Sequence, residues 1–168
     1  MMVMEYLDIV DKDDHVIGMA SKTDIYKKRL PHRIVHVLIF NKHGKLMMQK
    51  RSTECSYKPL HWATSAAGHV RSGEDCEKAA LREYEEELGT KSELEFFAKD
   101  FYQASDSPDK FLVTFKTVFE GPFKPDPHAV ADTGFFSLDE IHRMIGRGEK
   151  MHPELMFLLK THWPKTFK

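Results

Sequence analysis

The chain has 168 residues, of which 30% are charged, and its formal net charge is −1 at pH 7; this is the size of one domain, residues 1–168, without the basic excess of a nucleic-acid-binding protein. No apolar run approaches the roughly 18 residues that a membrane span needs, and the acidic Glu5, Asp8 and Asp11 stand where a signal peptide would be apolar. The two cysteines, Cys55 and Cys76, are too few for a disulfide framework, so we expect a cytoplasmic protein that contacts neither a membrane nor a nucleic acid polymer.

The first segment of the chain predicts an N-terminal β-hairpin over residues 5–20. Two short β-prone runs, residues 6–10 and 15–20, flank a polar turn of Asp and Lys. Ser21 with Asp24 three positions later resembles a capping box, so a short helix is expected to follow the hairpin.

A second hairpin is expected from residues 33–40 and 45–51. The first of these runs is almost continuously hydrophobic, which indicates an interior strand covered on both faces. Residues 52–62 have the composition of a loop, and the small side chains of residues 62–67 predict a short strand that leads into Gly68.

The second half of the chain predicts three further strands and two further helices. They are strands over residues 94–102, 110–119 and from 135, with a loop over 104–109, and helices from 138 and from 153. Together with the earlier elements, this order predicts a mixed α/β (α+β) architecture in which helices pack on a β-sheet.

The helix expected after Gly68 carries an acidic face beside an apolar one. At about 100° per residue, Glu83, Glu86 and Glu87 fall in one sector. The side chains of the neighbouring sector, expected to enter the core, are Ala80, Leu81, Tyr84 and Leu88. Three carboxylates this close repel one another unless a cation lies among them. The pattern therefore predicts either a Mg²⁺ site, since Mg²⁺ prefers oxygen ligands together with substrate phosphates, or a solvated helix face without a catalytic role.

This stretch resembles the Nudix box, the signature of the Nudix hydrolase family. The seven matching positions within residues 68–90 are Gly68, Glu74, Arg82, Glu83, Glu86, Glu87 and Gly89, and the two weaker matches are Tyr84 and Thr90. The resemblance implies an α/β/α sandwich with a mixed β-sheet. It also implies Mg²⁺-dependent hydrolysis, with Mn²⁺ able to replace Mg²⁺, of a diphosphate bond in a nucleoside diphosphate linked to another group or in a similar small diphosphate.

The resemblance also implies roles for the residues of the Nudix box. The catalytic side chains would be Glu74, Arg82, Glu83 and Glu86, and the metal ligands Glu83, Glu86, Glu87 and the Gly68 carbonyl. An ion pair between Glu74 and Arg82 would fix the loop on the helix. The general base varies in position between family members, and within the box Glu86 is the favoured residue.

The expected substrate ligands are Arg51, Arg71, His69 and His32. Arg pairs bidentately with phosphate, and a surface ion pair is the alternative for each arginine. Specificity is expected to reside in the loops 52–62 and 103–110. Exposed edge strands would permit a homodimer.

Parts of the chain outside the box resemble the Nudix branch that includes isopentenyl diphosphate isomerase. These parts are the N-terminal hairpin, residues 30–33 and residues 49–51. The isomerase uses a cysteine just before the box glycine and two glutamates on a later strand. Here Ala67 and the carboxylate-free run 111–115 occupy these places, so hydrolysis is favoured over isomerisation.

A nucleotide-binding module without turnover is the remaining alternative. Related hydrolases often have a Glu in the loop before the last strand, and Ala129 stands at the equivalent position. Asp132 and His128 are the nearby substitutes, so the general base stays open.

Overall fold

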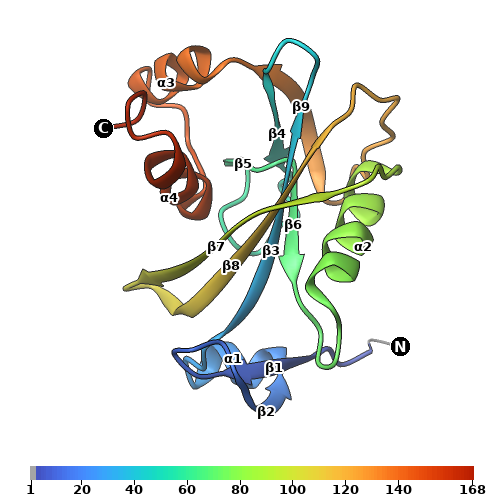
Figure 1. The fold of residues 1–168 in the computed structure, drawn as a ribbon, viewed down its shortest axis with the longest axis vertical. Helices are drawn as coiled ribbons and strands as arrows, with labels where there is room; N and C mark the ends of the chain where they lie inside the picture. The colour runs from blue at the N-terminus through green and yellow to red at the C-terminus, as the bar shows by residue number, and fades with distance from the viewer. Residues whose placement is uncertain (1–2) are drawn as a thin grey trace.

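The structure is a computed structural model that describes residues 3–168. Its elements are β1 (Tyr6–Val10), β2 (Val16–Ser21), α1 (Lys22–Lys27), β3 (His32–Phe40), β4 (Leu46–Arg51), β5 (Trp62–Ala63), β6 (Ala66–His69), α2 (Cys76–Leu88), β7 (Glu95–Ala104), β8 (Ser107–Val118), β9 (Val130–Phe136), α3 (Leu138–Gly146) and α4 (Pro153–His162). A seven-stranded mixed sheet lies between α2 on one face and α3 and α4 on the other, with β1, β2 and α1 at one end (Figure 1). The predicted architecture and the N-terminal hairpin are confirmed.

The central strand β3 is buried on both faces, as its hydrophobic run predicts. Its alternate residues Val35, Val37 and Ile39 pack with the apolar side of α2 in one core cluster. On the other face, Leu38 packs with α3 and α4, and Ile34 packs with α4. β3 also pairs in parallel with β8 along its whole length, which makes it the axis of the sheet.

The hairpin expected between β3 and β4 forms only at its closed end. These strands pair at Phe40 and Leu46, and β6 then takes the edge of β3 from Ile34 to Val37. The Ser65 hydroxyl donates to Met47 O at 2.6 Å and accepts from Ile39 N at 2.9 Å, so it bridges the two strands where they diverge. The single strand expected over 62–67 is accordingly two strands, β5 on β4 and β6 on β3.

The β7–β8 connection is a tight hairpin and not the loop expected over residues 104–109. Ala104 pairs with Ser107, and the Arg29 guanidinium donates to both carbonyl oxygens at 3.3 and 2.8 Å. These bonds from a distant residue hold the tip in strand geometry, which the local composition does not reveal. β9 likewise begins at Val130, five residues before the expected start, because it pairs with β4.

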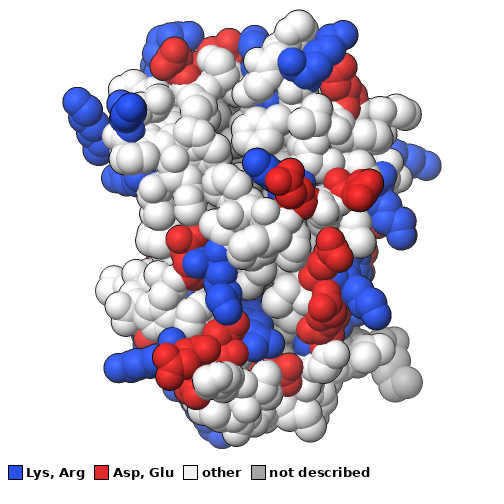
Figure 2. Space-filling view, in the orientation of Figure 1, with Lys and Arg blue, Asp and Glu red and all other residues white. Residues whose placement is uncertain are grey.

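Charged side chains of both signs are mixed over the face shown in Figure 2, with acidic ones gathered where α2 lies. None of the helices within residues 3–168 is long and apolar enough to cross a membrane.

Candidate functional site

Capping fixes the helix α2 at both ends and so fixes its acidic face. The Asp75 carboxylate accepts from the backbone of Glu77 and Lys78, and Gly89 ends the helix in the left-handed conformation at φ 70°. Tyr84 and Leu88 are then fully buried on the sheet side. The expected core stripe is confirmed, and with it in the core Glu83 and Glu87 face β6.

The expected ion pair between Glu74 and Arg82 is present and is bidentate. Arg82 Nε and Nη2 donate to the two Glu74 carboxylate oxygens at 2.8 and 2.9 Å. Arg82 Nη2 also donates to His69 O at 3.0 Å, which ties the helix to the end of β6. The hydrogen bonds from Arg82 lower the pKa of Glu74, so this carboxyl stays ionised.

Gly68 lies directly against Glu83. A Cβ built on Gly68 would overlap the Glu83 carboxyl group, so only glycine permits this approach. Arg82 Nη1 donates to Glu83 Oε1 at 2.8 Å, and Gln49 Nε2 donates to Glu87 Oε1 at 2.5 Å. The helix, β6 and β4 therefore meet around two carboxylates.

Glu83 and Glu87 contact each other, and burial raises the pKa of both carboxyl groups, Glu87 the more strongly. Two carboxyl groups in contact hold one proton between them unless a cation replaces it. A hard divalent cation suits this pair of oxygen donors, so the residues present fit Mg²⁺ or Mn²⁺. Glu86 is different: its side chain is 54% exposed and lies 3.5 Å from Arg82 Nη1.

Within residues 3–168, the box contains no set of three His, Cys, Asp or Glu side chains whose donor atoms all lie within 4.8 Å of one another. The side chains whose donor atoms lie within 4.8 Å of one another are Asp11, Asp13 and His15, in the turn between β1 and β2. The Asp11 carboxylate accepts from the backbone of Asp13 and His15 at 2.9 Å each, so turn geometry accounts for this cluster.

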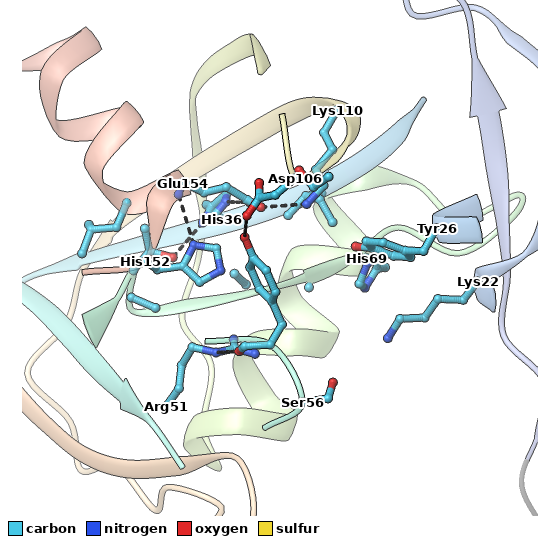
Figure 3. Close-up of a pocket in the computed structure, with 18 residues that line it drawn as sticks. Lys22, Tyr26, His36, Arg51, Ser56, His69, Asp106, Lys110, His152 and Glu154 are labelled. Carbon is cyan, nitrogen blue, oxygen red and sulfur yellow. Dashed lines mark hydrogen bonds and ion pairs between the residues drawn. The ribbon is translucent and has the colours of Figure 1, made fainter. Parts of the chain in front are cut away.

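A cavity of about 340 Å³ opens on the side of the sheet where β3 and β4 diverge, beside Ala67 and Gly68 (Figure 3). Arg51 and Lys22 reach toward it from opposite sides. Arg51 Nε donates to Tyr57 O at 3.0 Å, and Lys22 Nζ is 3.9 Å from a Glu5 carboxylate oxygen. The cavity is large enough for a small ligand, and three cationic side chains line it, Arg51, Lys22 and Lys110.

The other expected substrate ligands lie in different places. Arg71 pairs with Glu5 at 3.2 Å, the surface ion pair that was its alternative, and it does not line the cavity. His69 lines the cavity, with Nε2 2.6 Å from the Tyr26 hydroxyl. His32 is fully buried behind it and stacks on its ring at 5.6 Å. Burial lowers the pKa of both histidines, so the two rings are neutral near pH 7.

The sequence model of a protein family, described as the NUDIX domain, matches residues 30–159 of this chain. The chain belongs to the Nudix family. It is 34% identical over 128 residues to an isopentenyl-diphosphate Delta-isomerase of Serratia proteamaculans, covering 76% of this chain and 72% of that protein. It is 32% identical over 147 residues to an uncharacterized Nudix hydrolase of Streptomyces coelicolor, covering 86% of this chain and 81% of that protein. The crystal structure of DR0079 from Deinococcus radiodurans shares the fold, with a TM-score of 0.80 and 24% identity over 94% of this chain and 98% of that one.

The chain is thus a Nudix hydrolase, and its structure adds cavity residues that sequence reasoning missed. Glu154 of α4 accepts from His36 Nε2 and from Lys110 Nζ, each at 2.9 Å. Burial alone raises the pKa of Glu154, but His36 and Lys110 lower it well below its ordinary value. No spacing signal in the sequence links these residues, because they come from three separate elements.

The loop that precedes β9 in this Nudix domain offers no buried base. Ala129 contributes its backbone oxygen to Ser52 N at 3.0 Å. His128 is exposed and pairs with Glu54 at 3.1 Å, and the exposed Asp132 carboxylate accepts from the backbone of Thr133. Neither substitute is aimed into the cavity by these contacts.

Stability of this Nudix domain is expected to fall as the pH drops from about 6.5 toward about 4. Burial lowers the pKa of His152 from 6.5 to about 4, and the opposing effect of the nearby Glu154 carboxylate, which raises this pKa, is smaller. Below pH 6.5 the unfolded chain therefore binds a proton that the folded chain does not. A shift of this size is worth roughly 3 kcal/mol at most. Because His152 Nδ1 also caps α4 by accepting from Glu154 N, His152→Asn supplies a capping oxygen in its place while removing the titrating group. Urea unfolding at several pH values should then give a shallower pH dependence for the variant, and an unchanged slope would contradict this account.

Proposed function

We propose that the protein hydrolyses, with bound Mg²⁺, the diphosphate bond of a nucleoside diphosphate linked to another group or of a similar small diphosphate. The observation that carries the proposal is the contact between the partly buried Glu83 and Glu87 carboxylates, next to a cavity lined by the cations Arg51, Lys22 and Lys110. A divalent cation bound there would neutralise phosphate oxygens and activate water.

The side chains of this chain divide the remaining work. Arg82, held by Glu74, positions Glu83 and keeps β6 on the helix. Arg51 and Lys22 bind the anionic diphosphate at the sides of the cavity. Glu86 accepts the proton of the attacking water, since among the carboxylates at the matching box positions, Glu74, Glu83, Glu86 and Glu87, its side chain is the most exposed.

Isomerisation is the alternative that the Serratia relative raises. Ala67 lines the cavity, and its methyl group transfers no proton. On β8 the buried Leu112 and Thr114 carry no carboxylate. These side chains favour hydrolysis. The proposal also includes a cytoplasmic location, supported by the two free thiols of Cys55 and Cys76.

The test is a substrate panel in the presence of Mg²⁺, comprising nucleoside diphosphates, nucleotide sugars, dinucleotides and isopentenyl diphosphate. We expect phosphate or a nucleoside monophosphate to be released from at least one substrate, and chelation by EDTA to abolish this release, because the carboxylate pair then lacks its cation. Mn²⁺ should restore activity. Nucleotide binding without product release on any substrate would support the binding-module alternative, and an isomer formed from isopentenyl diphosphate would support the isomerase.

A further inference from the structure

The floor of the cavity holds an ion pair that is almost fully buried. Lys110 is 4% exposed and Glu154 is 5% exposed, and their charged groups lie 2.9 Å apart. Figure 3 shows them with His36 on the side of the cavity away from Lys22 and Arg51. An ion pair in this position is costly to desolvate, so its remaining hydrogen-bonding capacity matters.

That capacity is only partly used by the protein. The Lys110 ammonium has three N–H donors; among residues 3–168 it donates to Glu154 and otherwise lies 5.7 Å from the centre of the Tyr26 ring. The Glu154 carboxylate offers about four acceptor sites, of which His36 and Lys110 use two. A buried ammonium that has one hydrogen-bond acceptor and lies at the floor of a cavity favours a ligand that accepts hydrogen bonds from its remaining N–H groups.

A hydroxyl group can bond both to the unused donors of Lys110 and to the unused acceptor sites of Glu154. It accepts a hydrogen bond from Lys110 and donates one to Glu154. A hydrocarbon chain satisfies neither, and a second anion would face the Glu154 carboxylate. The charge distribution agrees with this division, because Arg51, which donates to a backbone oxygen, and Lys22, which lies 3.9 Å from Glu5, are both away from the floor.

We propose that the group attached to the diphosphate is a neutral hydroxylated group, such as the sugar of a nucleoside diphosphate sugar, and that Lys110 and Glu154 select it by hydrogen bonding to a hydroxyl. This inference rests on the proposed function, because it takes the diphosphate to lie against the Nudix box. It assigns the specificity of the enzyme to the floor of the cavity, on β8 and α4, and excludes isoprenoid diphosphates as preferred substrates.

The inference is tested by comparing UDP-glucose, whose diphosphate carries a uridine and a glucose, with geranyl diphosphate, whose diphosphate carries one hydrocarbon chain. We expect the wild-type kcat/KM to favour UDP-glucose by about tenfold or more. Lys110→Met and Glu154→Gln should each raise KM for UDP-glucose by about 10–100-fold, as loss of one hydrogen bond to a charged group predicts, with kcat nearly unchanged. KM for geranyl diphosphate should stay the same or fall. Equal losses on both substrates, or a wild-type preference for geranyl diphosphate, would overturn the proposal.

A matched control separates selection from folding. Asp100→Asn removes the carboxylate from a second polar contact of α4, between His162 Nε2 and Asp100 Oδ2 at 2.8 Å, and neither residue lines the cavity. This variant should keep the wild-type preference. If the variants at Lys110 and Glu154 fail to fold, a series of deoxyglucose analogues of UDP-glucose tests the wild-type protein directly. Removal of one particular hydroxyl should raise KM about tenfold or more, and a flat series would contradict the proposal.

Binding measurements distinguish failure of this inference from failure of the proposed hydrolysis. Calorimetric titration of the Glu86→Gln variant with UDP-glucose and with geranyl diphosphate needs no turnover. If no substrate is hydrolysed but UDP-glucose binds more tightly than geranyl diphosphate, the inference stands and hydrolysis is rejected. If geranyl diphosphate is hydrolysed in preference, hydrolysis stands and the inference is rejected. If neither binds, the inference is rejected as well.

Discussion

Replacing Glu86 with Gln is expected to lower kcat by about 10²–10⁴-fold, the usual effect of removing a general base. The folded state should be nearly unaffected, because the Glu86 side chain is 54% exposed and its nearest ion-pair partner is 3.5 Å away. Steady-state hydrolysis of the best substrate from the panel measures kcat, and thermal unfolding measures stability. A variant with full activity would show that Glu86 has no part in the reaction.

The neighbouring Glu85 supplies a matched control for Glu86. It lies on the same helix, its side chain is 57% exposed, and it pairs with Lys91 at 3.2 Å. Glu85→Gln removes the same charge from α2 and should leave kcat within about twofold of wild type, as expected for a surface ion pair. A Mg²⁺ titration then separates two roles for Glu86: excess Mg²⁺ restores activity to a variant that lost a ligand and does not restore one that lost its base.

The acidic face of α2 could be predicted because it depends on local geometry. The positions of Glu83, Glu86 and Glu87 follow from helical periodicity, and the Glu74–Arg82 ion pair spans eight positions. The caps at Asp75 and Gly89 also use nearby residues. Sequence patterns carry such information because the interacting groups lie within a few helical turns.

The floor of the cavity could not be predicted because its residues meet only through tertiary packing. Glu154 is 118 positions from His36 and 44 from Lys110. Each of these residues has an ordinary structural interpretation in its local sequence: Glu154 is an acid in the first turn of a helix, and Lys110 is a polar residue in a strand. The same limit explains Arg71, whose partner Glu5 is 66 positions away, and the short β3–β4 pairing, which depends on where β6 docks.

Gly68→Ala is expected to reduce both activity and stability, although it adds a single methyl group. The new Cβ would overlap the Glu83 carboxyl group, so the Glu83 side chain must move and give up its present hydrogen bond from Arg82. A displacement of about 1 Å at a reacting centre can cost about 10²-fold in rate, and overpacking of this kind typically costs about 1–3 kcal/mol in the free energy of unfolding. Hydrolysis kinetics and urea unfolding measure the two effects.

The cause is steric and not conformational, because Gly68 lies outside the positive-φ region that only glycine adopts readily. Gly146→Ala is the matched control: Gly146 ends α3, its φ is also outside that region, and an added Cβ there meets no heavy atom within 4 Å. That variant should keep wild-type activity and stability. If Gly68→Ala did the same, the close approach of β6 to Glu83 would not be required, and the placement of the carboxylate pair against Gly68 would have to be revised. A loss of kcat with Gly68→Ala alone therefore ties catalysis to the fit between this glycine and the acidic face of α2.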